Sequence, residues 1–304
     1  MRASFARDPR IVIFTDDPGW HGRMLVAALA ARGLKAEYCS LKDCTFEITD
    51  AQPRMLLPGF AGALPAGAFV RGVPGGSLEE VVLRLDFLHC LAQCGVPVFN
   101  SGRAIERTVD KALTSFQLAL QGLPTPRTWV CESVARATEI AAPLFAAGCS
   151  LVMKPLFGSQ GEGLLRIDST AALAAAAPVG GVFYLQEYLS RGGPPYRDWR
   201  VLVIDGVARF AMERISAHWI TNRAQGATCV AAPLEPALAR LAAAAAAAVE
   251  IDYAGVDLMQ DAQGQWCVGE VNGVPAWWGL TQATGAAVTD ALVDAFCRRL
   301  RPAR

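Results

Sequence analysis

The chain has 304 residues and a formal net charge of +0, with 28 basic and 28 acidic side chains. This length allows a large core divided over two or three lobes. The balanced charge excludes the basic surface of nucleic-acid-binding proteins and the polybasic patches of membrane-surface proteins. We therefore expect a small-molecule partner, with no nucleic acid and no membrane involved.

The cysteines indicate a reducing environment. There are 9 of them, scattered through the chain without a Cys-x-x-Cys pair. Cys90 and Cys94 share a predicted helical face, but no second pair completes a zinc site. The first apolar run, at 11–14, is too short for a signal peptide. An odd cysteine count without a signal peptide predicts a cytoplasmic protein.

Residues 1–100 alternate between apolar, strand-like runs and helical stretches. Strands are predicted at 11–15, 35–41, 54–57, 68–71 and 97–99, and helices at 21–32 and 77–93. Such alternation predicts a doubly wound parallel sheet. Asp16 and Asp17 follow the first strand, at the edge where such sheets bind ligands. Capping of the next helix is an equally good interpretation of these two residues.

A second region begins after Asn100-Ser101-Gly102. Its first predicted element is an amphipathic helix at 110–121, whose second residue is Lys111. The pattern alone indicates a solvated lysine at this position. Further strands are predicted at 127–131, 151–154 and 183–188, and helices at 133–147 and 169–177.

A short apolar strand delivers Lys154 to a loop rich in glycine, and a further strand follows from Leu164. The loop residues that we assign to ligand binding are Gly158, Ser159, Gln160, Gly161 and Gly163. Closely spaced glycines let backbone N–H groups approach an anion, and the lysine adds a point charge, so the loop predicts a polyphosphate ligand. It is neither a Walker loop nor a dinucleotide-binding fingerprint. A glycine-rich hairpin without a ligand is the alternative.

The segment 198–214 predicts a hairpin turned at Asp205-Gly206. Asp198 and Arg200 are two residues apart and point the same way, and Arg214 lies near the end of the return strand. Arginines in strands are often surface residues. Two that converge on a phosphate site would stabilise a transferring phosphoryl group, and we assign both Arg200 and Arg214 this role.

Three oxygen-bearing side chains interrupt two apolar strands near the end of the chain. Glu270 and Asn272 share one strand face, and Asp257 can face them from the neighbouring strand. Oxygen ligands without nearby His or Cys suit Mg²⁺ that is held jointly with nucleotide phosphates. A solvated strand face is the alternative. Beyond them, Trp277 and Trp278 predict either a platform for an aromatic ligand or an anchor for the last helix, at 286–299.

Seven features in this order and approximate spacing resemble the ATP-grasp ligases, and within them most closely the RimK-type amino-acid ligases, many of which add L-glutamate. The features are Lys111, the loop from Lys154 to Gly163, Gln186-Glu187-Tyr188, Asp198-Trp199-Arg200, Trp219-Ile220-Thr221-Asn222, Gly255-Val256-Asp257 and Glu270-Val271-Asn272. The resemblance covers the chain from about Ser101 to its end. Ile220 and the Gly226-Ala227 pair depart from the family pattern, which puts a charge contact and the flexibility of that loop in doubt.

The resemblance implies an α/β fold with three parts: an N-terminal doubly wound domain at 1–100, a small lid lobe with the glycine-rich loop at 101–188, and a C-terminal lobe with the metal site at 189–304. It also implies individual roles. Lys111 would reach the nucleotide phosphates, Gln186, Glu187 and Tyr188 would form the hinge beside the adenine, and Asp198 would lie at the ribose or the phosphates. Asn222 would lie near the phosphates and a second metal ion.

The implied activity is that of an ATP- and Mg²⁺-dependent carboxylate-amine ligase that works through an acyl phosphate. Two Mg²⁺ ions are expected, with Mn²⁺ as a substitute. L-Glutamate is the expected amine, and the expected acceptor is a carboxylate on a small coenzyme similar to tetrahydromethanopterin or on a protein. A homodimer or homotetramer is expected. A ligase for another amino-acid and amine pair, or a non-catalytic nucleotide-binding regulator, is the alternative.

Overall fold

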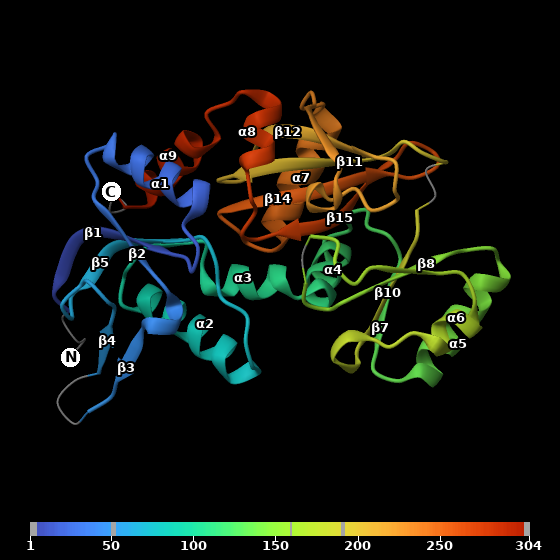
Figure 1. Cartoon of the computed structure of the whole chain (residues 1–304), viewed down its shortest axis with the longest axis horizontal. Helices are drawn as coiled ribbons and strands as arrows, with labels where there is room; N and C mark the ends of the chain where they lie inside the picture. The colour runs from blue at the N-terminus through green and yellow to red at the C-terminus, as the bar shows by residue number, and fades with distance from the viewer. Residues whose placement is uncertain (1–4, 50–52, 159, 190–191, 301–304) are drawn as a thin grey trace. The chain divides into compact units, whose positions relative to one another are not determined.

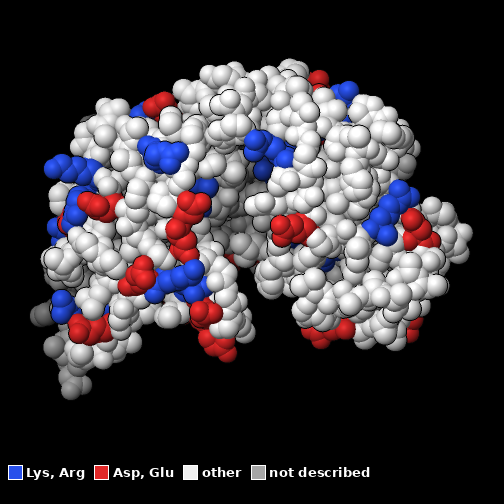
Figure 2. All heavy atoms as spheres, viewed as in Figure 1, with Lys and Arg blue, Asp and Glu red and all other residues white. Residues whose placement is uncertain are grey.

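The computed structural model describes residues 5–49, 53–158, 160–189 and 192–300. The chain divides into two compact units. Unit 1 comprises Met1–Glu106, Ile251–Ala254 and Gly273–Arg304, and unit 2 comprises Arg107–Glu250 and Gly255–Asn272. No helix within the described ranges is long and apolar enough to span a bilayer. On the face shown in Figure 2, acidic and basic side chains are interspersed on a largely uncharged surface.

Unit 1 is built on a four-stranded sheet in which every pairing is parallel, with strand order β2-β1-β5-β6. Its strands are β1 (Arg7–Phe14), β2 (Ala36–Cys39), β5 (Leu64–Val70) and β6 (Val98–Phe99). Helices α1 (Gly19–Ala30) and α9 (Val288–Leu300) cover one face, and α2 (Leu78–Gln93) covers the other (Figure 1). The predicted doubly wound parallel sheet is therefore confirmed.

The unit 1 core lies on both faces of this sheet because the central strands are buried on both sides. Val12 and Phe14 of β1 belong to a buried cluster that contains Leu88 of α2. On the opposite face, Phe69 of β5 packs edge-on against Phe296 of α9. Ser77 begins α2 with a capping box, which fixes the start of this helix.

The strand predicted at 54–57 does not join the parallel sheet. It forms β4 (Arg54–Leu56), which pairs antiparallel with β3 (Thr45–Glu47) in a separate two-stranded ribbon after η1 (Leu41–Asp43). The stretch from 48 to 53, which connects these two strands, is too short for the crossover that a parallel pairing needs, so they pair antiparallel.

Unit 2 contains a small antiparallel sheet with strand order β7-β10-β8-β9. Its elements are β7 (Thr128–Cys131), α5 (Val134–Ala146), β8 (Leu151–Lys154), β9 (Leu165–Ile167), α6 (Thr170–Ala175), η2 (Val179–Gly181) and β10 (Phe183–Glu187). Ala137 and Ala141 bring α5 onto this sheet, where they pack with Leu151 and Leu185 in a buried cluster. The predicted strands on both sides of the glycine-rich loop are confirmed as β8 and β9.

A second sheet has strand order β13-β12-β11-β14-β15. These strands are β11 (Tyr196–Ile204), β12 (Val207–Ser216), β13 (Thr228–Ala231), β14 (Tyr253–Gln260) and β15 (Trp266–Asn272). The remaining elements are α3 (Gly102–Val109), α4 (Lys111–Leu120), η3 (Arg223–Gln225), α7 (Pro236–Ala248) and α8 (Trp278–Thr284). The predicted hairpin is confirmed: Asp205 and Gly206 both have positive φ, 49° and 72°, as a tight two-residue turn requires.

Candidate active site in unit 2

A cavity in unit 2 collects most of the residues that the sequence singled out. The predicted site residues that line it are Lys111, Lys154, Gly158, Gln160, Gly161, Gln186, Glu187, Tyr188, Asp198, Arg214, Asn222, Asp257 and Glu270. Gly163, Arg200 and Asn272 do not line it, and Ser159 lies outside the described residues. Residues from both sheets of unit 2 thus meet at one cavity.

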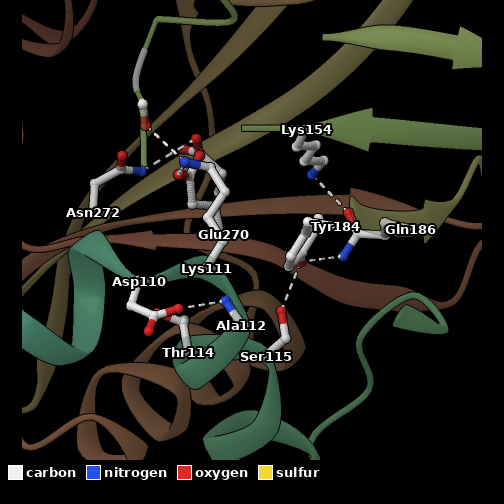
Figure 3. A network of polar contacts seen from close by, with 12 residues as sticks. Asp110, Lys111, Ala112, Thr114, Ser115, Lys154, Tyr184, Gln186, Glu270 and Asn272 are labelled. Atoms are coloured by element: carbon white, nitrogen blue, oxygen red, sulfur yellow. Dashed lines mark hydrogen bonds and ion pairs between the residues drawn. The ribbon is translucent and has the colours of Figure 1, made fainter. Parts of the chain in front are cut away.

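Lys154 ends β8 and directs its ammonium group to the side chain of Gln186 on β10, the neighbouring strand (Figure 3). The Nζ atom donates to Gln186 Oε1 at 2.7 Å. Gln186 in turn donates to the hydroxyl oxygens of Tyr184 at 3.2 Å and Thr128 at 3.1 Å. Burial lowers the pKa of Lys154, because it disfavours the charged ammonium form. A cation held in this way has a strong requirement for an anionic ligand.

Lys111 begins α4, directly after the N-cap Asp110, whose carboxylate accepts from the backbone N–H groups of Ala112 and Leu113. Its Nζ atom donates to the Gly158 carbonyl at 2.7 Å and lies 3.6 Å from Glu270 Oε1 (Figure 3). The helical pattern alone indicated a solvated lysine, but the side chain of Lys111 is only 11% exposed. It connects the glycine-rich loop to the strand that carries Glu270.

The glycine-rich loop packs against the segment that contains Asn222. Gly161 has a φ of +76°, and a Cβ atom there would lie 2.7 Å from Asn222 Oδ1 and 2.8 Å from Ile220 Cγ2. Gln225 donates from Nε2 to the Gln160 carbonyl at 3.3 Å. Only glycine fits this position without displacing its neighbours, which explains one glycine of the motif in physical terms.

The hinge residues have partners of their own. The Glu187 carboxylate accepts from Arg127 Nε at 2.8 Å and Nη2 at 2.9 Å, and this pairing holds the pKa of Glu187 below its usual value. The guanidinium of Arg166 lies 4.4 Å from the centroid of the Tyr188 ring. No motif in the sequence marks Arg127 and Arg166 as neighbours of the hinge, because these contacts depend on strand pairing.

Two arginines and two aspartates form a buried network on β11, β12 and β14. Arg200 binds both oxygens of Asp257 at 2.7 Å, and Arg214 binds both oxygens of Asp198 at 2.6 Å. Arg214 also lies 3.1 Å from Asp257 Oδ2. Burial alone would raise the pKa of Asp257, but the two arginines outweigh it and lower the pKa to about 2. Asp257 is therefore charged throughout the physiological range.

Asp198 positions Arg214 in this structure. The two residues are direct cross-strand partners, and Asp198 also accepts from the Thr221 hydroxyl at 2.6 Å. Thr221 was not assigned a role from the sequence, although it precedes Asn222 in the quoted motif. Apolar lining residues such as Val152 and Met259 were also missed, because nothing but strand alternation marks them.

Glu270 and Asp257 are register partners on β15 and β14, and Asn272 is opposite Gly255 on the same pair of strands. Asn272 Nδ2 donates to the Gly255 carbonyl at 3.1 Å and lies 3.4 Å from Asp257 Oδ2. Because the amide nitrogen makes these contacts, the amide oxygen stays available to a cation. Within the described ranges no three His, Cys, Asp or Glu side chains form a metal cluster. Two carboxylates and one amide oxygen fit Mg²⁺ whose other ligands are phosphate oxygens or water.

Trp277 cannot act as an exposed aromatic platform. Its side chain is 0% exposed and donates from Nε1 to Thr289 Oγ1 on α9 at 2.9 Å. The second of the two interpretations, an anchor for the last helix, is the one that this geometry supports for Trp277.

Comparison with known proteins agrees with this geometry. Residues 108–296 match the family model described as a RimK-like ATP-grasp domain. The tetrahydromethanopterin:alpha-L-glutamate ligase of Methanococcus maripaludis is 35% identical over 75% of this chain and 77% of its own length. The alpha-aminoadipate–LysW ligase LysX of Saccharolobus solfataricus is 27% identical over 66% of this chain and 74% of its own.

The fold is also shared with solved structures. The ATP-grasp ligase PsnB, solved with a minimal precursor, Mg and ADP, aligns with a TM-score of 0.72 over 95% of this chain and 98% of its own, at 20% identity. D-cycloserine synthetase DcsG aligns with a TM-score of 0.67 over 96% of this chain and 99% of its own, at 19% identity. The chain therefore belongs to the RimK-like ATP-grasp family, and it is an ATP- and Mg²⁺-dependent ligase that forms carbon–nitrogen bonds.

Proposed function

We propose that this ligase joins the amine of L-glutamate to a carboxylate of a small coenzyme similar to tetrahydromethanopterin, or of a protein. The observation that carries the proposal is the convergence, in one cavity, of two lysines, a buried arginine and the metal-type carboxylates of Asp257 and Glu270. The similarity to tetrahydromethanopterin:alpha-L-glutamate ligases supports glutamate and the coenzyme acceptor.

We assign ATP to the side of the cavity that carries the lysines. The nucleotide-binding set is Lys111, Lys154, Gly158, Ser159, Gln160, Gly161, Gly163, Gln186, Glu187, Tyr188 and Asp198. Lys154 and Lys111 are the two ammonium groups that would pair with phosphate oxygens. Their present hydrogen-bond partners, the Gln186 side chain and the Gly158 carbonyl, are neutral, and Lys111 also lies 3.6 Å from Glu270 Oε1. The buried position of Lys154 favours this role, since a bound phosphate would compensate its desolvated charge.

We assign Mg²⁺ to Asp257, Glu270 and Asn272, with two ions expected and Mn²⁺ as a substitute. When bound, the metal supplies charge neutralisation and orientation of the phosphate oxygens. The chain's own contribution is the arginine pair. Arg200 and Arg214 are held in fixed positions by Asp257 and Asp198, so their donors are preorganised for the oxygens of a transferring phosphoryl group. Asn222 would contribute a neutral donor beside the loop.

The reaction that these residues would support has two steps. An acceptor carboxylate oxygen attacks the γ-phosphorus of ATP, the bond to ADP breaks, and an acyl phosphate forms. The amine of glutamate then attacks the acyl carbon, inorganic phosphate leaves, and the amine loses a proton to give the amide. The glycine-rich loop would keep water from the acyl phosphate by closing over it. No residue of the chain needs to become a covalent intermediate.

Three further expectations belong to this proposal. The division into domains at 1–100, 101–188 and 189–304 stays a prediction, and so does a homodimeric or homotetrameric state. A cytoplasmic location is supported by the cysteines, all 9 of which are free thiols in the structure.

The proposal is tested by mass spectrometry of acceptors incubated with the chain, ATP, Mg²⁺ and L-glutamate. The acceptor panel holds a reduced pterin coenzyme with a free carboxylate and a peptide ending in a carboxylate. We expect one acceptor to gain a glutamyl residue with the wild type and with Glu139→Ala, an exposed control on α5. We expect no gain with Asp257→Asn or Glu270→Gln. If ADP release depends on a different amine, that amine replaces glutamate as the proposed substrate. ATP binding without turnover would contradict the proposal.

A further inference from the structure

The parallel sheet of unit 1 has a topological switch point between β1 and β5. From β1 the chain moves outward to β2, and it then returns to place β5 on the other side of β1 and β6 beyond it. Open α/β sheets bind ligands in the crevice at the carboxyl ends of the strands on either side of such a point. In this chain β1 ends at Phe14 and β5 ends at Val70, and the next residue, Arg71, donates its backbone N–H to the Phe14 carbonyl at 2.9 Å. Arg71 therefore stands at the switch point itself.

The guanidinium of Arg71 is held in a fixed position by neutral groups. It donates from Nη1 to the Pro275 carbonyl at 3.1 Å and lies 4.7 Å from the centroid of the Trp277 ring. Trp277 is fixed by its bond to Thr289 and by His21, whose Nε2 accepts the backbone N–H of Trp277 at 3.1 Å. An arginine held by stacking loses little entropy when it binds a planar anion.

No carboxylate within the described ranges forms an ion pair with Arg71, although Arg71 is half-buried. Arg10, Arg32 and Arg84 of the same unit all form ion pairs, with Asp8, Asp290 and Glu80. The groups around Arg71 do not supply a negative charge. Burial and Arg71 lower the pKa of His21 to about 4, and burial raises the pKa of Tyr253 to about 12 although Arg71 opposes the rise. A half-buried cation without a counterion is costly unless a ligand provides one.

The chain after Arg71 leaves room for such a ligand. It continues as Gly72-Val73-Pro74-Gly75-Gly76 to the N-cap of α2. A Cβ atom at Gly72 or Gly75 would meet nothing within 4 Å, whereas one at Gly76 would clash with Glu80 Oε2, so the open part of the segment is at 72–75. On the β2 side of the same edge, the Asp16 carboxylate is already paired with Lys42 Nζ at 2.6 Å and with the Ser40 hydroxyl at 2.6 Å. Its charge is thus matched and does not balance that of Arg71.

We propose that Arg71 forms a carboxylate-binding site at the β1/β5 switch point of unit 1. The Trp277 ring holds the Arg71 guanidinium, and the segment 72–75 leaves space beside it for the ligand. Its ligand is a small carboxylate, bound through the remaining N–H donors of the guanidinium. L-Glutamate, which keeps two carboxylates free when its amine reacts, is the ligand that the proposed function supplies, so this part of the inference rests on that function.

The test is equilibrium binding of small anions to the full chain in the presence of Mg²⁺ and a non-hydrolysable ATP analogue. The probes are L-glutamate, L-aspartate, glutarate and inorganic phosphate. We expect Arg71→Gln to weaken binding of the preferred carboxylate about tenfold or more, as the loss of charge-assisted hydrogen bonds predicts. Arg71→Lys keeps the stacked cation but not the fork of donors, so it should fold normally and show an intermediate loss. Arg23→Gln, an exposed arginine on α1, should bind as the wild type does.

The outcomes separate this inference from the proposed function. If the wild type ligates glutamate and Arg71→Lys leaves both its KM and the affinity for carboxylates unchanged, the site is overturned while the function stands. If glutamate is not a substrate but another carboxylate binds in a way that depends on Arg71, the proposed site is supported and the assignment of glutamate as its ligand is wrong. Equal Arg71-dependent affinity for inorganic phosphate would overturn the carboxylate class, and no binding of any probe would overturn the site.

Discussion

At the scale of single residues, Asp257 lies in a tightly constrained environment. Its carboxylate is bound on both oxygens by Arg200, and Arg214 approaches one of them at 3.1 Å. A divalent ion at the same carboxylate has to share it with two guanidinium groups. If Asp257 binds the metal as we propose, Arg200 competes with the metal for this carboxylate when no nucleotide is bound.

This competition predicts that Arg200→Gln binds Mn²⁺ more tightly than the wild type when no nucleotide is present. Two unit charges about 4 Å apart interact by roughly 4 kcal/mol at an effective dielectric constant of 20, so removal of one guanidinium should improve the dissociation constant at least tenfold. Electron paramagnetic resonance of free Mn²⁺ measures this directly. Arg209→Gln removes an exposed positive charge from β12 and serves as the control. Equal Mn²⁺ affinity in all three proteins would show that Arg200 does not compete with the metal ion for the Asp257 carboxylate.

Which single residues the sequence could identify depended on local spacing. Lys154, Asp257, Glu270 and Asn272 were predicted because each interrupts or ends an apolar strand, and the structure brings the first three to one cavity. The partners Arg127 of Glu187 and Thr221 of Asp198 were not found, because they approach from strands or loops that the alternation of apolar residues does not connect.

At the scale of elements, the glycine-rich loop depends on close approach to the segment from Ile220 to Gln225. Gly161→Ala adds a methyl group at a φ of +76° and directs it at Asn222 Oδ1, 2.7 Å away. We predict a loss of about 1–2 kcal/mol from the left-handed backbone. We also predict at least a tenfold lower kcat/KM for ATP, because the added methyl group prevents the loop from packing against the segment that contains Asn222.

Gly148→Ala is the matched control for that variant. Gly148 has a φ of +78°, but a Cβ atom there would meet nothing within 4 Å. The two variants should lose similar stability in urea unfolding, and only Gly161→Ala should lose activity in a coupled ADP assay. Equal activity of the two variants would mean that contact between the loop and Asn222 is not needed.

The elements that the sequence predicted best are those fixed by local chemistry. The hairpin at Asp205-Gly206 and the strand that ends at Lys154 are examples, since a turn dipeptide or an apolar run defines each. The β3–β4 ribbon and helix α8 were not predicted correctly. Helix α8 is short, its N-cap residue Trp277 makes no side-chain capping bond, and His21 accepts the N–H groups of Trp277 and Trp278 from α1, more than 250 residues away in sequence.

At the scale of the whole molecule, stability should depend on His21. Burial lowers the pKa of its imidazole to about 4, while the unfolded chain has a value of about 6.5. Because the folded pKa is depressed, this contribution is present above pH 6.5 and is lost as the pH falls towards 4. Between pH 7.5 and 5 the wild type should lose up to about 2 kcal/mol through this residue, less the part that solvent screens.

Urea unfolding at the two pH values measures this loss. His21→Gln keeps an acceptor but does not titrate, so its free energy of unfolding should fall less between pH 7.5 and 5. His218→Gln, which removes an exposed histidine, should follow the wild type. The same pH dependence in all three proteins would contradict a neutral, half-buried His21.

The compact units also show what a sequence cannot reveal about a whole chain. Residues 251–254 and 273–304 belong to unit 1, although they follow unit 2 in sequence. Tyr253 illustrates the reason: its hydroxyl donates to the Val70 carbonyl at 2.8 Å, and its backbone N–H donates to Asn100 Oδ1 at 2.9 Å. Contacts between segments more than 150 residues apart leave no periodic signal in the sequence.

The central claim is that the unit 2 site transfers a phosphoryl group to a carboxylate before the amide bond forms. The most direct measurement uses the acceptor identified by mass spectrometry, labelled with ¹⁸O in its carboxylate. After turnover with ATP, Mg²⁺ and the amine, an acyl-phosphate route places one labelled oxygen in the inorganic phosphate, and we predict this result. If the product forms and the inorganic phosphate contains no ¹⁸O, the account is contradicted.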